Sequence, residues 1–163
     1  MEDWRNFDVE HLATFTVSQQ DEILHPADGI RRLLHMKGLR LRSKKMILRI
    51  DRDHIAIYNL FNNGEMIERF QHSRIVEPTA FTSLDPMEIY RNILIFVVKE
   101  DSLNFVLPEM HAFYCAGVPS DLIVKHMKMN IAENYRQNKP LVLLPPNNTQ
   151  LLMENKVDYC TWL

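Results

Sequence analysis

Alternating apolar and polar positions predict a series of β-strands along this chain. In residues 9–17, Val9, His11, Ala13, Phe15 and Val17 alternate with more polar positions, a pattern typical of a strand with one buried face. Further strands are expected at residues 45–50, 55–60, 66–70, 74–81, 93–98 and 110–115. Residues 93–98 are apolar at every position, which predicts a strand covered on both faces.

Two helices are expected, one after the first strand and one after the last. Pro26 can begin the first helix and Gly38 can end it, although Gly29 inside it should cost some stability. Ser120 is a suitable N-cap for the second helix, which should run to about Tyr135 with one apolar stripe. Strands grouped together and followed by a closing helix favour the α+β class.

One predicted strand carries a proline. Pro78 lies within residues 74–81, and proline in a sheet is confined to edge strands or bulges because it has no N–H to donate. This segment is therefore the expected open edge of the sheet. Proline and charge on an edge can also serve to prevent pairing, so a blunted edge is the alternative interpretation. The sequence Asn62-Asn63-Gly64 predicts a tight turn before residues 66–70.

Composition and charge narrow the possible functions. The chain has 163 residues, enough for one domain, and a net charge of -2, which gives no global attraction to nucleic acid. Its longest apolar run, residues 93–98, is too short to span a bilayer, and its start lacks the apolar core of a signal peptide. With two cysteines and no disulfide framework, a cytoplasmic protein is expected.

The sequence carries no clear catalytic or metal-binding pattern. His111 and Cys115 are four residues apart, which on a strand is roughly 13 Å and too far for shared chemistry. Asp51 and Asp53 fall in an expected turn, where carboxylates usually shape the turn. No enzyme activity, cofactor or metal is therefore expected.

Several short segments, in this order, resemble a known family. They are Val9-Glu10-His11-Leu12, Lys44-Lys45-Met46-Ile47-Leu48, Val98-Lys99-Glu100, and His111-x-Phe113-x-Cys115 before the last helix. Together they resemble the phosphotyrosine-binding (PTB) domain of the epidermal growth factor receptor kinase substrate 8 family. The resemblance implies a pleckstrin-homology-like fold, an antiparallel sandwich or partly open barrel of about seven strands capped by a C-terminal helix. Residues 9–138 would form the domain, residues 1–8 an extension, and residues 139–163 an irregular tail.

The resemblance also implies a function and a site. PTB domains act as adaptors that bind an extended peptide as an added strand, commonly one containing Asn-Pro-x-Tyr. Expected partners are cytoplasmic tails of receptors or integrins, in signalling to actin. The strand side of the site would comprise Arg74, Ile75, Val76, Glu77 and Thr79, and the helix side Val124, Lys128 and Ile131. Ile131 stands where many PTB domains have phenylalanine, and Pro78 is expected to interrupt the edge.

Positive charge raises two further questions. Phosphotyrosine requires well-placed cations, and the candidates Arg49, Arg52 and Arg74 fall in no motif that fixes them in a pocket, so we expect binding without phosphorylation. The alternative function is phosphoinositide binding at the inner face of the plasma membrane. Its candidate residues form a basic run after Arg31 and Arg32, namely Lys37, Arg40, Arg42, Lys44 and Lys45. A merely solvated basic surface would explain the same run.

Overall fold

A computed structural model of the chain describes residues 5–36, 43–61, 64–88 and 91–138. The elements are β1 (Arg5–Thr16), α1 (Pro26–His35), β2 (Lys44–Ile50), β3 (His54–Asn59), β4 (Met66–Gln71), the 3-10 turn η1 (His72–Arg74), β5 (Ile75–Thr82), β6 (Asn92–Val98), β7 (Glu109–Cys115) and α3 (Ser120–Asn138). They confirm the expected α+β class. The predicted tail, residues 139–163, lies outside the described part, as does Gly38.

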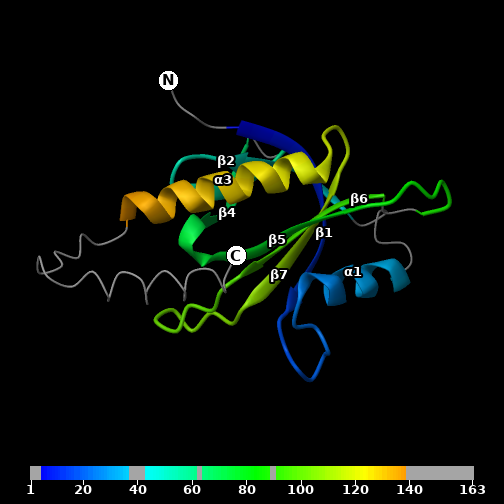
Figure 1. The fold of residues 1–163 in the computed structure, drawn as a ribbon, viewed down its shortest axis with the longest axis horizontal. Coiled ribbons are helices and arrows are strands. Elements are labelled where there is room, and N and C mark those ends of the chain that lie inside the picture. The colour runs from blue at the N-terminus through cyan, green and yellow to red at the C-terminus, as the bar shows by residue number, and fades with distance from the viewer. Residues whose placement is uncertain (1–4, 37–42, 62–63, 89–90, 139–163) are drawn as a thin grey trace, which may run out of the picture.

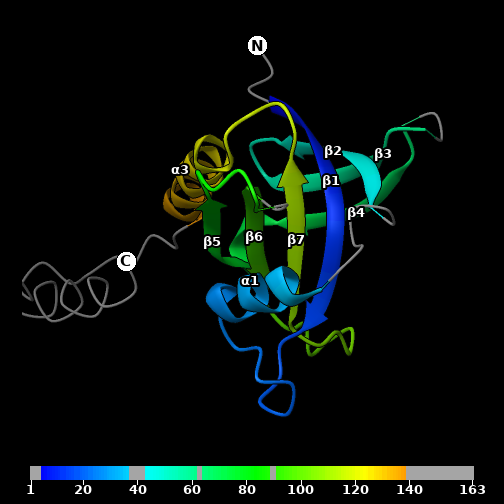
Figure 2. The same ribbon diagram turned by 90° about the vertical axis from the view of Figure 1, so that its right-hand side faces the viewer.

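Seven antiparallel strands form one open sheet among the described residues, in the order β4-β3-β2-β1-β7-β6-β5. The sheet curves so that β4 approaches β6 in the other half of the sheet, where Phe70 of β4 lies 6.3 Å from Phe96 of β6, measured between ring centroids. Figures 1 and 2 show α1 crossing one face of β5, β6 and β7, while α3 lies along the β5 end. β4 and β5 are thus the two edges of this sheet.

Two apolar clusters occupy the two faces of β6. Leu94, Phe96 and Val98 belong to the cluster that α3 closes. Ile93, Ile95 and Val97 belong to the cluster beneath α1. This division explains why residues 93–98 are apolar at every position, and it confirms the prediction of a strand covered on both faces.

β1 departs from the simple alternation expected for residues 9–17. Its register against β7 shifts between His11 and Ala13, so Leu12 is an extra residue in the strand. Val9 therefore packs in the α3 cluster, whereas Phe15 packs in the α1 cluster. The prediction of a single apolar face was wrong because a bulge exchanges the two faces. The strand also begins at Arg5, within the expected extension, and Phe7 is part of the core.

Gly29 allows α1 to lie close to the sheet. A Cβ atom at this position would come within 2.5 Å of the Met110 Sδ and 2.7 Å of the Ile95 Cδ1, and both neighbours are fully buried. A larger residue would force the core to shift, which typically costs more than the helix gains from losing a glycine. The glycine that weakens this helix locally is thus required by its packing.

Candidate docking edge at β5 and α3

β5 is the edge strand that the sequence predicted from Pro78. It pairs with β6, and no strand in the described ranges pairs with its other side. The N–H of Ser83 donates to the Arg91 carbonyl, just beyond the last residue pair of this ladder, Thr82 and Asn92. Because the backbone groups of an antiparallel strand point alternately to either side, those of Ala80 and Thr82 face the open side. No strand of the described residues pairs with these groups.

Asn92 fixes α3 beside that edge. Its side-chain amide donates to the carbonyls of Cys115 (2.8 Å) and Val118 (2.9 Å), and its oxygen accepts from the N–H of Ser120 (2.8 Å). The Ser120 hydroxyl, expected as the helix cap, is buried and has no hydrogen-bond partner among the described residues. The cap prediction was therefore wrong: the helix begins at Ser120, and a side chain from β6 accepts from the N–H of this first residue.

α3 runs from the Thr82 end of β5 toward η1. Its first turn is held by Asn92, which pairs with Thr82, and the helix also contacts η1. Near the far end, Arg52 in the β2–β3 turn donates twice to the Gln137 Oε1, at 3.2 and 3.1 Å. Both ends of the helix are thus anchored, so its position against β5 is defined along its length.

An apolar strip borders the edge. Ala80 on β5, Val118 before α3 and Ile131 on α3 are half-buried and pack against the core cluster that α3 closes. Lys128 on α3 is exposed. Half-buried aliphatic groups beside an unpaired strand leave apolar area that an added chain could cover. We call these three residues the β5–α3 strip.

The remaining residues expected at the site occupy several different positions. Ile75 and Val124 are buried in the core at 4% and 8% exposure, so their side chains have little surface to offer a ligand. Val76 is half-buried on the α1 face of the sheet. Arg74 lies in η1 before the strand, and its Nη2 donates to the Lys99 carbonyl at 3.0 Å. These placements leave fewer of the expected side chains accessible to a ligand beside the β5–α3 strip.

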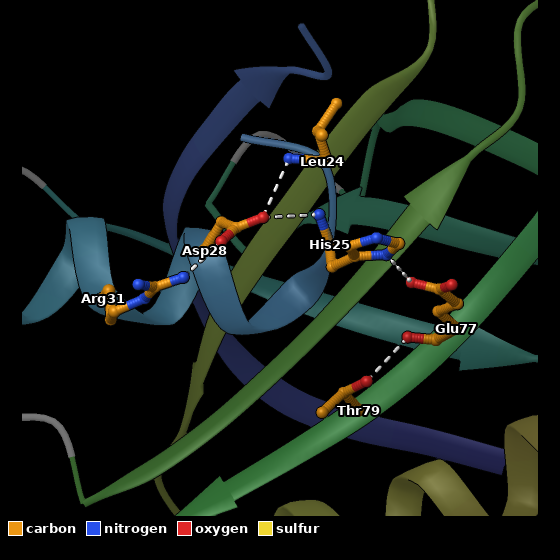
Figure 3. Close-up of polar contacts among 6 residues, drawn as sticks. All are labelled: Leu24, His25, Asp28, Arg31, Glu77 and Thr79. Atoms are coloured by element: carbon orange, nitrogen blue, oxygen red, sulfur yellow. Dashed lines mark hydrogen bonds and ion pairs between the residues drawn. The ribbon is translucent and has the colours of Figure 1, made fainter. Parts of the chain in front are cut away.

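A bulge divides β5 at Glu77 and Pro78. The register shifts between Val76, opposite Val97, and Thr79, opposite Ile95, so two residues face the single Phe96. Glu77 adopts a φ of 53°, and the Thr79 hydroxyl donates to the Glu77 carbonyl at 2.8 Å. Figure 3 shows the Glu77 carboxylate directed toward His25 at the start of α1, at 3.4 Å from its Nδ1. Pro78, expected to perturb pairing, lies within the bulge.

The three arginines considered for phosphate do not converge. Arg49 on β2 lies over the Tyr58 ring and donates to Asn6, whereas Arg52 is engaged with Gln137. Arg74 contacts the Lys99 carbonyl. Each guanidinium therefore serves a different local contact, and together they do not form one bidentate pocket.

The basic run is only partly described. Lys37, Arg40 and Arg42 lie outside the described residues, while Lys44 and Lys45 are exposed at the start of β2. The upstream Arg31 and Arg32 line a pocket of about 320 Å³ together with acidic residues. The full lining is Asp21, Glu22, Ile23, Asp28, Arg31, Arg32 and His35. Arg31 is paired with Asp28, so this pocket does not concentrate positive charge.

His111 fills the corner where β4 approaches β7. Its ring stacks on Phe96 and lies near Phe70, and its Nδ1 is 3.3 Å from the Thr14 hydroxyl. Burial lowers the pKa of His111 to about 4, and the nearby His11 acts in the same direction. Carboxylates of Glu68 and Glu109 lie 3.8 and 3.3 Å from its two nitrogens and act in the opposite direction, but the side chain is 2% exposed and desolvation prevails.

The described residues contain no group of three or more side chains suited to a metal ion. Burial raises the pKa of the Cys115 thiol to about 12, which disfavours the reactive thiolate. Asp51 accepts hydrogen bonds from the N–H groups of Asp53 and His54, the turn-forming role expected of it. Within the described ranges, no helix has the length and apolar character needed to cross a bilayer.

Comparison with known proteins agrees with this architecture. The family model for the phosphotyrosine-binding domain matches residues 6–141. The chain is 30% identical to rat epidermal growth factor receptor kinase substrate 8 over 81% of its own length, but it spans 16% of that protein. It is 22% identical to human epidermal growth factor receptor kinase substrate 8-like protein 2. That match covers 82% of this chain and 18% of the relative.

A solved structure shares the fold at lower sequence similarity. The C-terminal phosphotyrosine interaction domain of mouse APBB2 superposes with a TM-score of 0.59 at 12% identity, over 81% of this chain and 88% of the other. The likeness concerns the fold, whereas the match of the family model extends over most of the sequence. This chain belongs to the phosphotyrosine-binding domain family.

Proposed function

We propose that this domain is a non-catalytic adaptor that binds extended peptides of the Asn-Pro-x-Tyr type as an added strand on β5. The observation that carries the proposal is the unpaired side of β5 next to the β5–α3 strip. Backbone groups of Ala80 and Thr82 would supply the hydrogen bonds, and Ile131 would cover an aliphatic residue of the peptide. Such peptides occur in cytoplasmic tails of receptors and integrins, which would place the domain in the cytoplasm, in signalling to actin.

We also propose that binding does not require phosphorylation. The dispersed positions of Arg49, Arg52 and Arg74 support this view, because phosphate recognition depends on several cations directed at one point. The bulge at Glu77 and Pro78 would confine regular pairing to the part of β5 that follows it.

The first prediction concerns how phosphorylation of the peptide and replacement of Ile131 affect peptide affinity. A fluorescent Asn-Pro-x-Tyr peptide should bind the wild type with similar affinity whether or not its tyrosine is phosphorylated. Ile131→Lys should weaken binding about tenfold, since it replaces apolar contact area worth about 1 to 2 kcal/mol with a charge. Met129→Lys is the matched control, because Met129 lies on the same helix but is 58% exposed, and it should leave affinity unchanged.

Two results would contradict this proposal. Equal binding by the Ile131→Lys and wild-type domains would remove the β5–α3 strip from the site. A gain of tenfold or more with phosphate, about 1.4 kcal/mol, would show that phosphate is recognised.

Phosphoinositide binding is the second candidate function. The exposed pair Lys44 and Lys45 supports it, since each cation near an anionic surface contributes roughly 1 kcal/mol. On this hypothesis, Lys44→Glu with Lys45→Glu should abolish sedimentation with phosphoinositide vesicles at physiological salt. The control reverses the same number of charges on α3, at Lys125 and Lys128. Unchanged sedimentation of the β2 variant would exclude lipid binding by this pair.

A further inference from the structure

The open side of β5 has a second flank, which faces α1. α3 borders the edge on one face of the sheet, and the N-terminal end of α1 approaches β5 on the other, as Figures 2 and 3 show. Successive side chains of a strand point to opposite faces. A strand docked on β5 would therefore direct every second side chain toward α1, away from the β5–α3 strip.

The bulge brings Glu77 to this second flank. In a regular strand, Glu77 would point away from the face occupied by its neighbour Val76, which packs in the α1 cluster. The extra residue and the φ of 53° instead direct its carboxylate to His25, at the start of α1. The side chain of Glu77 is still 50% exposed, so a docked strand could reach it.

The charged residues Asp28 and Arg31 on this flank are paired with each other and do not occupy the Glu77 carboxylate. Asp28 accepts hydrogen bonds from the N–H groups of Leu24 and His25, at 3.0 and 2.9 Å, and it is paired with Arg31. Arg31 of α1 is thus engaged with Asp28. The positive end of the α1 dipole would act against a bound cation, but Asp28 in the first turn offsets it. On the α3 side, Lys128 is an exposed residue of the opposite charge.

We propose that Glu77 forms a specificity subsite for a basic residue, lysine or arginine, in the docked strand. This inference rests on the proposed function, and it adds a sequence preference for the bound peptide. The docked residue that lies beside Glu77 favours a cation, and positions that face α3 favour an aliphatic or acidic residue. Opposite charges on adjacent strands attract, so the effect on affinity should be a factor of about three to five.

The test uses one parent peptide containing Asn-Pro-x-Tyr, with each of the six preceding residues changed in turn to Lys, Ala or Glu. Affinities are measured by fluorescence anisotropy at low and at physiological salt. The wild type should prefer Lys to Glu by about threefold to fivefold at one of the positions that face α1, and the preference should shrink with salt. Glu77→Gln should remove it and Glu77→Lys should reverse it.

Lys128→Gln is the matched control, since it lies on the opposite flank. It should change the charge preference only at the intervening positions. A wild type that binds the parent peptide but does not distinguish Lys from Glu would overturn the subsite alone, as would a Glu77→Gln variant that keeps the preference. A wild type that binds no peptide of the series would overturn the proposed function and this inference with it.

Discussion

Replacing Asn92 with alanine should destabilise the domain by about 3 kcal/mol. The change removes three hydrogen bonds and leaves the carbonyls of Cys115 and Val118 and the N–H of Ser120 without their partner in a partly buried position. Each group deprived of its partner there costs about 1 kcal/mol. The free energy of unfolding from urea titration measures the loss directly.

Two further variants test whether the lost hydrogen bonds of Asn92 cause this destabilisation. Asn92→Asp keeps an acceptor for the Ser120 N–H but places a carboxylate against two carbonyls, so it should also be destabilising. Asn104→Ala removes one hydrogen bond, to Asp101 in an exposed loop, and should cost less than about 1 kcal/mol. If the free energy of unfolding of Asn92→Ala lay within about 1 kcal/mol of the wild-type value, Asn92 would not be what anchors α3.

Acidification should weaken the fold through His111. The folded-state pKa is about 4, below the ordinary value of 6.5, so between these values the unfolded chain binds a proton that the folded domain excludes. The stability contributed by this group is therefore complete above pH 6.5 and is lost progressively as the pH falls toward 4. The expected loss between pH 7.5 and 4.5 is about 2 kcal/mol.

His111→Phe separates this effect from the other titrating groups. Phenylalanine keeps an aromatic ring beside Phe96 and Phe70 but cannot bind a proton. Urea unfolding of both proteins from pH 7.5 to 4.5 should show a shallower loss of stability in the variant. The pKa of His72 is also lowered, chiefly by burial, so some dependence should persist in both proteins. Parallel pH profiles would exclude His111 as the source.

The open edge was predictable from a single residue. Pro78 cannot donate to a ladder, which confines its segment to an edge or a bulge, and the structure has both at β5. The bulge in β1 was not predictable in the same way. Residues 9–17 alternate convincingly, but whether Leu12 is an extra residue depends on the register that β7 imposes.

The sequence by itself determined the strand and helix types, the α+β class, the edge character of residues around Pro78 and the family resemblance. These follow from local patterns of polarity and from backbone limits carried by each residue. The tertiary structure alone decided the contacts between distant segments. Asn92 caps α3. Gly29 leaves room for the side chains of Met110 and Ile95, and the Glu77 carboxylate is directed toward His25. Each depends on a partner far along the chain, and only the folded sheet brings the two together.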